Sequence, residues 1–153
     1  MTRLERFLAF SADVTAFSDF QLRGTGQAEP YLATVVDVVG EALVDELLER
    51  HARLPDGDRE TSLRREIFSD EQLGPIARNL VKLWFVGIWY ELPAAWREAF
   101  GARERDVTFM VSATAYTEGL LWPAIGANPP GAKAPGYGTW AAPPRIPAPE
   151  AAG

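Results

Sequence analysis

The single histidine, His51, is the first side chain to consider for acid–base chemistry in this chain of 153 residues. It is predicted to lie near the C-terminal end of a helix, where a protonated imidazole interacts favourably with exposed carbonyl groups. A catalytic histidine needs a nucleophile, an orienting carboxylate or a second metal ligand beside it, and a lone histidine is weak evidence for such a site. The helix-end interpretation is therefore favoured over catalysis.

A row of acidic residues is the second candidate for chemistry. Asp37, Glu41, Asp45 and Glu49 follow one another at intervals of four, which places them on nearly the same side of a helix. Such a row could hold a cation, dock a basic surface, or simply face solvent. Like charges at this spacing cost only about 0.2–0.5 kcal/mol per pair, so a solvated face is favoured. A di-iron site would need Glu-x-x-His pairs, which this sequence lacks, and no metal site is predicted.

A loop motif, the amino-acid composition and the net charge argue against several other kinds of site. The sequence Gly24-Thr25-Gly26 resembles the opening of a dinucleotide-binding loop, but Glu29 occupies the place of the third glycine and would repel a pyrophosphate. The absence of cysteine excludes disulfides, iron–sulfur clusters and thiolate zinc sites. A net charge of −6 argues against nucleic acid as a partner. No cofactor-binding residue is predicted in this chain.

The aromatic side chains are more informative, because all five tryptophans lie in the C-terminal half. Trp84 is predicted to be part of the core. Tyr137 and Trp140 stand in the segment APGYGTWAAPP, which has no helix to bury them. They could fold back over the chain's own helices, or they could insert into another protein, where tryptophan is enriched at energetic centres. These residues alone leave both interpretations open.

Hydrophobic periodicity and turn signals predict an all-α fold, a small bundle of four to five helices. The expected helices cover residues 3–18, 30–53, 69–90, 93–100 and 107–121. Ser69 and Gln72 are expected to form a capping box at the start of the third. The helical domain is predicted to span residues 1–122. Residues 123–153 hold eight of the twelve prolines and are predicted to form an extended arm whose last residues are disordered.

The sequence also bears on location. The apolar N-terminus is interrupted by Glu5, Arg6 and Asp13, so it does not resemble a secretory signal. Arg78 and Lys82 shorten the most apolar run below the roughly 20 residues that a membrane span requires. The prediction is a cytoplasmic chain without a direct membrane span, or a periplasmic one if a partner exports it.

Four motifs resemble one family in the same order along the chain: FLAFSADVTAF, LWFVGIW, AYTEGLLW and GYGTWAAPP. The family is the small, gamma-type subunit of FAD-dependent sugar and polyol dehydrogenases, the membrane-bound FAD-containing D-sorbitol dehydrogenase family, with fructose and glucose dehydrogenase small subunits. The resemblance spans about Leu4 to Pro144. Its core motif is Trp84, Phe85 and Gly87, and its later motifs run from Tyr116 to Trp122 and around Tyr137, Trp140 and Pro143.

The resemblance implies a non-catalytic subunit. In the family the large subunit, of the glucose–methanol–choline type, holds FAD and the catalytic histidine, and a cytochrome c subunit can take the electrons onward. The family's small subunit also carries its partner across the inner membrane through a twin-arginine signal, which this sequence lacks. Many members have a cysteine in the C-terminal segment, and here residues 126–138 have none. The expected FAD therefore belongs to the partner.

The expected partner contacts combine the aromatic and proline-rich features of the C-terminal third. They are Tyr116, Trp122, Tyr137, Trp140, Pro143 and Pro144. The alternative hypothesis is a stand-alone enzyme or small-molecule binder, with a pocket built from the aromatic residues of segment 84–90 and a carboxylate such as Glu91 or Glu118. A third is a helical scaffold with no redox partner.

Overall fold

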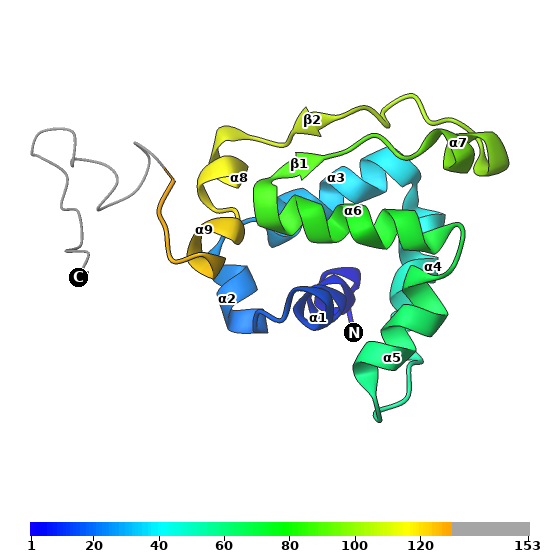
Figure 1. Cartoon of the computed structure of the whole chain (residues 1–153), viewed down its shortest axis with the longest axis horizontal. Coiled ribbons are helices and arrows are strands. Elements are labelled where there is room, and N and C mark those ends of the chain that lie inside the picture. The colour runs from blue at the N-terminus through cyan, green and yellow to red at the C-terminus, as the bar shows by residue number, and fades with distance from the viewer. Residues whose placement is uncertain (130–153) are drawn as a thin grey trace, which may run out of the picture.

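The computed structural model describes residues 1–129, and these residues form a mainly helical fold, which confirms the all-α prediction (Figure 1). The elements are α1 (Arg3–Thr15), α2 (Asp19–Gly24), α3 (Ala28–Val39), α4 (Glu41–Ala52), α5 (Arg59–Leu63), the π-helix η1 (Arg64–Phe68), α6 (Leu73–Val86), β1 (Ile88–Trp89), α7 (Ala94–Phe100), β2 (Phe109–Met110), α8 (Ala113–Thr117) and α9 (Leu121–Ala124). They are more numerous and shorter than expected. Most of the predicted arm lies outside the described residues. Within residues 1–129, no helix combines the length and the apolar character needed to cross a bilayer.

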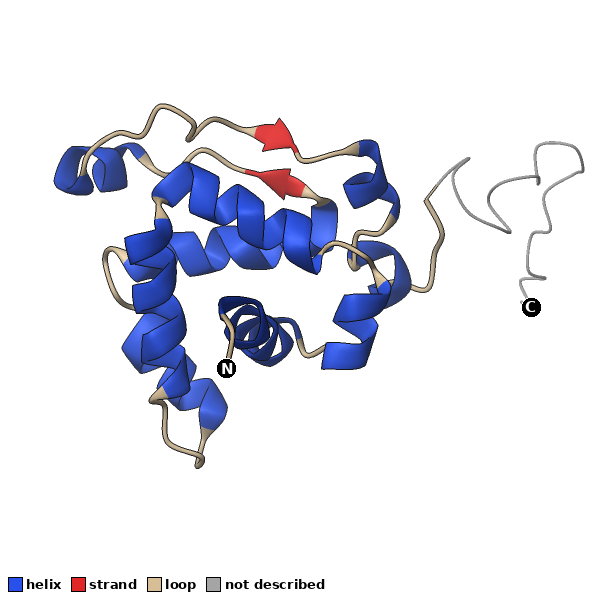
Figure 2. Ribbon diagram, turned by 180° about the vertical axis from the view of Figure 1, so that it is seen from behind, coloured by secondary structure: helices blue, strands red, loops and turns tan. Residues whose placement is uncertain are grey.

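Helix α6 occupies the middle of the fold, where it contacts α1, α3 and α4 (Figure 2). Its Trp84 is 1% exposed and lies where three helices meet. The indole stacks on Phe7 of α1 at 6.1 Å between ring centroids and meets Tyr31 of α3 edge-on at 4.9 Å. Its Nε1 donates a hydrogen bond to Ser11 Oγ at 2.9 Å, so the polar edge of the ring is satisfied. The prediction that Trp84 belongs to the core is confirmed.

The predicted helix over residues 30–53 is interrupted at Gly40. This glycine adopts φ 93°, a backbone conformation that residues with a side chain rarely adopt, and it separates α3 from α4. The apolar pattern continues across the break, since Val39 and Leu43 are both buried. Periodicity alone therefore did not reveal it.

The break also divides the acidic row. Three of its members pair with arginines from other parts of the chain, and Glu49 pairs with Arg53 at the end of its own helix. Arg3 binds Glu41 at 2.9 Å and Asp45 at 2.8 Å, joining α1 to α4. Arg105 pairs with Asp37. These pairs are consistent with a solvated, charge-balanced surface.

The start of α6 differs from the expected capping box. Asp70 accepts hydrogen bonds from the backbone N–H groups of Gln72 at 2.9 Å and Leu73 at 2.8 Å. Ser69 instead ends η1 and donates its hydroxyl to the Arg65 carbonyl at 2.6 Å. The prediction of Ser69 as the cap was wrong because the preceding residues are already helical.

Beyond α6 the helix expected over residues 93–100 is present as α7, but the end of the third expected helix and the start of the last one form an antiparallel strand pair instead. Gly87 adopts φ 74° and ends α6, so the helix does not continue to Tyr90 as predicted. Ile88 and Trp89 instead pair antiparallel with Met110 and Phe109, within the segment predicted to be the last helix. The two-stranded sheet orders the chain between α6 and α8. A second difference lies at α2, a short helix where a loop was expected.

The end of α1 offers a simple stability prediction. Ala16 caps this helix in the left-handed conformation with φ 65°, which costs a residue with a Cβ more than it costs glycine. Ala16→Gly is therefore expected to raise the free energy of unfolding by up to about 1 kcal/mol. Urea denaturation measures the change. Ala33→Gly, in the middle of α3, should lower stability by a similar amount, and equal effects of the two changes would contradict the prediction.

Candidate partner-docking surface

The core motif and the later motif of the resemblance meet in the structure. The end of α6 lies against the segment that carries α8 and α9, about thirty residues later in the chain. The N–H of Leu120 donates to the Trp84 carbonyl at 3.0 Å, and the N–H of Val111 donates to the Gly87 carbonyl at 3.0 Å. The two motifs therefore form one packing unit.

Two glycines allow this close approach. A Cβ on Gly119 would lie 2.6 Å from the Phe85 carbonyl oxygen, and a Cβ on Gly87 would lie 2.8 Å from the Ala115 carbonyl oxygen. Both distances are shorter than any real side-chain contact, so each position requires glycine. This explains the glycine of the Trp84–Phe85–Gly87 motif in physical terms: it ends a helix and admits a neighbouring backbone.

Tyr116 and Trp122, two of the six predicted partner contacts, lie together on this unit. Their rings meet edge-on at 5.6 Å, and Trp122 Nε1 donates to the Tyr116 carbonyl at 3.0 Å. Both side chains remain partly exposed. The other four predicted contacts, Tyr137, Trp140, Pro143 and Pro144, lie outside the described residues.

Three apolar side chains at the same end of the fold are exposed to solvent. Phe20 of α2 is 86% exposed, Ile125 just after α9 is 62% exposed, and Leu121 of α9 is 37% exposed. The helices α2 and α9 lie side by side in both views, and residues of both line a shallow groove of about 310 Å³ (Figures 1 and 2). We define the docking face by its exposed or half-exposed apolar residues: Phe20, Tyr116, Leu121, Trp122 and Ile125.

Three members of this face were not among the partner contacts predicted from the sequence. Phe20 follows a capping serine and an aspartate in a segment expected to be a loop, and Leu121 and Ile125 were expected at or beyond the end of a longer helix. The sequence did contain a signal at Phe20. The residues three and four positions after it are Arg23 and Gly24, so no apolar side chain follows it at helical spacing.

The alternative hypothesis builds a pocket from the four aromatic residues of segment 84–90, of which two are buried and two, Phe85 and Tyr90, are half-buried. Trp84 and Trp89 are 1% and 0% exposed, so a ligand cannot reach either ring in this structure. Of the two carboxylates proposed with them, Glu91 pairs with Arg97 at 3.2 Å. Glu118 lines the groove between α2 and α9.

His51 has charged partners that the sequence did not reveal. Its Nε2 lies 2.6 Å from Asp13 Oδ2, and Arg59 Nη2 lies 2.6 Å from the same oxygen. The imidazole is 5% exposed. Within residues 1–129, no hydroxyl group hydrogen-bonds to the ring, and no group of three or more metal-ligating side chains is placed to hold an ion. The cluster is best described as a buried link between α1, α4 and α5.

This cluster gives a prediction for stability against pH. Partial burial raises the pKa of Asp13, but hydrogen bonds from Arg59 and His51 outweigh it, so the pKa is below its ordinary value. A lowered pKa in the folded state stabilises the protein above the ordinary value of about 3.9, and this stabilisation is lost as the pH falls through the lower, folded-state value. Asp13→Asn should therefore flatten the fall in melting temperature below about pH 4. Asp56→Asn, at an exposed turn, is the control, and identical acid profiles for the wild type and Asp13→Asn would contradict the prediction.

Comparisons with protein-family models, with curated proteins and with solved structures give no match.

Proposed function

We propose that this chain is a non-catalytic small subunit that binds and stabilises a larger FAD-dependent dehydrogenase of the glucose–methanol–choline type. The partner would oxidise a sugar, polyol or other alcohol and would hold the FAD, and a cytochrome c subunit could join the complex as electron acceptor. The observation that carries the proposal is the docking face. Phe20 of α2 is 86% exposed, and the neighbouring α9 and the residue after it carry the exposed Leu121 and Ile125. The resemblance of the ordered motifs supplies the identity of the partner.

The energetics favour a protein partner for this face. Burying one large apolar side chain contributes about 1.5–3 kcal/mol, so leaving three of them in water has a cost that a partner surface removes. Aromatic anchors surrounded by smaller apolar contacts are typical of the energetic centres of interfaces. The subunit would act in a chaperone-like way, by covering apolar surface of the flavoprotein and keeping it soluble.

The proline- and aromatic-rich residues that follow α9 extend the proposed interface. This segment contains four of the predicted partner contacts and follows Tyr116 and Trp122 in the sequence. The four are Tyr137, Trp140, Pro143 and Pro144. Prolines restrict the unbound chain and so reduce the entropy lost when a segment becomes ordered on a partner. Since the partner would determine the compartment, we expect the complex in the cytoplasm unless the partner carries an export signal.

Co-expression with a candidate FAD-dependent dehydrogenase of the glucose–methanol–choline type from the same genome tests the proposal. The two proteins are expected to elute from a sizing column as one species that carries flavin absorbance. Expression of the dehydrogenase alone is expected to give less soluble flavoprotein. Separate elution of the two proteins, with an unchanged yield of the dehydrogenase, would overturn the proposal.

Phe20→Ser tests the docking face itself. Because Phe20 is almost fully exposed, the change should leave the melting temperature of the free chain unchanged while weakening partner binding about 10- to 100-fold. Binding is measured by titration of labelled subunit into purified dehydrogenase. Phe100→Ser removes a partly exposed phenylalanine from α7, at the opposite end of the fold, and should leave the affinity unchanged (Figure 1). Equal losses in both variants would contradict the assigned face.

A further inference from the structure

The outer edge of the two-stranded sheet is a second surface, which the proposed function does not use. Strand β2 pairs with β1 on one side, and in both views no other element of residues 1–129 lies beyond it on the other side (Figures 1 and 2). The segment around this edge is uncharged, because residues 107–117 contain no charged side chain. It is also partly open to solvent, since Val107 is 51% exposed and Met110 is 47% exposed.

The hydrogen-bonding pattern shows which backbone groups face this edge. The register pairs Ile88 with Met110. Next to this pair, the N–H of Val111 donates to the Gly87 carbonyl at 3.0 Å. In an antiparallel ladder this pattern makes Ile88 and Met110 a pair without mutual hydrogen bonds, so the N–H and C=O groups of Met110 point away from β1. The N–H and C=O groups of Thr108, two residues earlier, likewise make no hydrogen bond within residues 1–129.

Two backbone donors and two acceptors are thus open at an edge that has none of the usual protections. Natural edge strands are commonly protected by lysine, by proline, by a β-bulge or by another element that covers them. The sequence from Val107 to Val111, VTFMV, contains no charge, proline or glycine, and four of its five residues are β-branched or aromatic. An edge of this kind favours pairing with another strand.

We infer that β2 pairs with β2 of a second copy of this chain, antiparallel and about a two-fold axis at Phe109. The strand complements itself in this register. Thr108 of each copy lies opposite Met110 of the other, and the two pairs exchange four N–H···O=C hydrogen bonds, which use all the open backbone groups. Such contact of one patch with its own copy is typical of two-fold dimers, the commonest form of homo-oligomer.

The side chains on the inner face of the strand also match in this register. Phe109 and Val111 already pack against the core, and Val107 lies on the same face of the strand because side chains alternate with a period of two. The axis places Phe109 opposite its own copy and Val107 opposite Val111 of the second copy. Aromatic and β-branched pairs of this kind stabilise sheets. The exposed Val107 would thereby gain an apolar neighbour.

This contact uses none of the five residues of the docking face, and the inference does not rest on the proposed function. Because only a short strand from each copy takes part, the interface is small and the dimer is expected to be weak. Its dissociation constant is expected to lie between about 1 μM and 1 mM.

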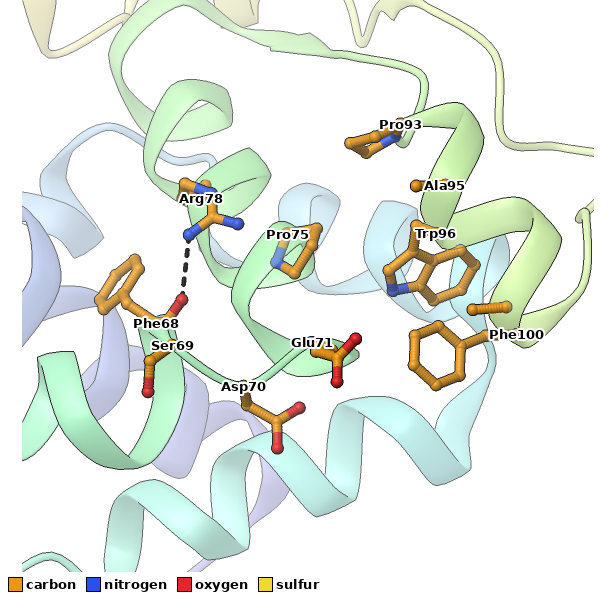
Figure 3. Close-up of a pocket in the computed structure, with 11 residues that line it drawn as sticks. Phe68, Ser69, Asp70, Glu71, Pro75, Arg78, Pro93, Ala95, Trp96 and Phe100 are labelled. Carbon is orange, nitrogen blue, oxygen red and sulfur yellow. Dashed lines mark hydrogen bonds between the residues drawn. The ribbon is translucent and has the colours of Figure 1, made fainter.

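The groove between the turn that precedes α6 and the helix α7 provides a comparison surface for testing this contact (Figure 3). It has a volume of about 370 Å³, and Trp96 and Phe100 form an apolar part of its wall. Phe100 is 37% exposed, which is close to the value for Met110. A dimer that formed by apolar contact at the groove would therefore respond to a charge at Phe100 and not to a charge at Met110.

Cysteine cross-linking of the full chain tests the register, since the sequence contains no natural cysteine. Val107→Cys and Val111→Cys are made in separate chains, which are then mixed. The inferred pairing places these two positions about 4.5 Å apart between Cα atoms, within the range of a disulfide, whereas each position lies roughly 14 Å from its own copy. The mixture is therefore expected to form disulfide-linked dimers about tenfold faster than either variant alone. Equal rates in the mixture and in the single variants would overturn the inference.

Sedimentation equilibrium of the chain without added cysteines tests the same contact. Met110→Lys places a charge on the strand edge, as natural edge strands do, and should raise the dissociation constant of the dimer about tenfold or more. Phe100→Lys is the matched control and should leave this constant unchanged. Both positions are partly exposed, so neither change should unfold the chain. A wild-type chain that remains monomeric at about 1 mM would overturn the inference, and so would a dimer that is weakened by Phe100→Lys but not by Met110→Lys.

Discussion

Replacement of Asp106 by alanine is expected to lower the free energy of unfolding by about 3–5 kcal/mol, the largest effect on stability that we predict. Asp106 is 2% exposed and accepts hydrogen bonds from Trp89 Nε1 at 2.9 Å and from the Leu92 N–H at 3.0 Å. Alanine would leave both donors buried without an acceptor, at a cost of about 1–3 kcal/mol each. The lost packing of the side chain adds to this cost.

Two control variants separate this effect from a general sensitivity to substitution. Asp106→Asn keeps one side-chain oxygen in place and should lose less than half as much stability as Asp106→Ala. Asp56→Ala changes an exposed aspartate and should stay within about 0.5 kcal/mol of the wild type. Urea denaturation followed by tryptophan fluorescence gives all three values. A loss below 1 kcal/mol in Asp106→Ala would show that the carboxylate does not hold the segment after β1.

Replacement of Trp140 by alanine is expected to weaken assembly with the flavoprotein by about 2–4 kcal/mol, which is roughly a 30- to 1,000-fold rise in Kd. The reason is its sequence context, because a tryptophan among glycines and prolines has no helix of its own to bury it. Tryptophan is also the residue type most enriched at the energetic centres of interfaces.

The matched control for this change is Trp140→Phe. It retains an aromatic ring of smaller area and should lose only part of the affinity, whereas the melting temperature of the free chain should be the same in all three proteins. Co-purification of Trp140→Ala at undiminished yield would count against the role of this residue. A fall in the melting temperature of the free Trp140→Ala chain would instead indicate that the ring packs within its own subunit.

Sequence periodicity predicted the helices whose apolar faces are continuous. α1 and α7 lie close to their expected positions, and Trp84 lies in the core as predicted. These features depend on local patterns of about 100° per residue and on turn residues such as Pro93 and Gly101. These predictions hold in the structure because the apolar side chains that set the pattern also make the packing contacts.

The missed features depend on contacts between distant segments. The strand of Phe109 and Met110 forms because Ile88 and Trp89 are presented beside it after Gly87 ends α6. Nothing local to residues 107–111 specifies that partner. The Asp13–His51 pair is likewise separated by 38 residues, so neither residue identifies the other in the sequence.

The docking face was predicted only in part, because its composition also depends on contacts between distant segments. Tyr116 and Trp122 were found from residue type, but Phe20 became a candidate only when the fold placed α2 beside α9 (Figure 2). Exposure is a property of the packed structure, and a phenylalanine in a short helix is buried more often than not.

Amide hydrogen exchange on the subunit with and without the dehydrogenase tests whether α2 and α9 form the interface. We expect the partner to slow exchange in α2 and in the segment from Ala113 to Ile125, while exchange in α5 is unchanged. Slower exchange confined to α5 and α7, with α2 and α9 unaffected, would contradict the docking face. Exchange that is identical everywhere with and without the dehydrogenase would contradict the small-subunit proposal as a whole.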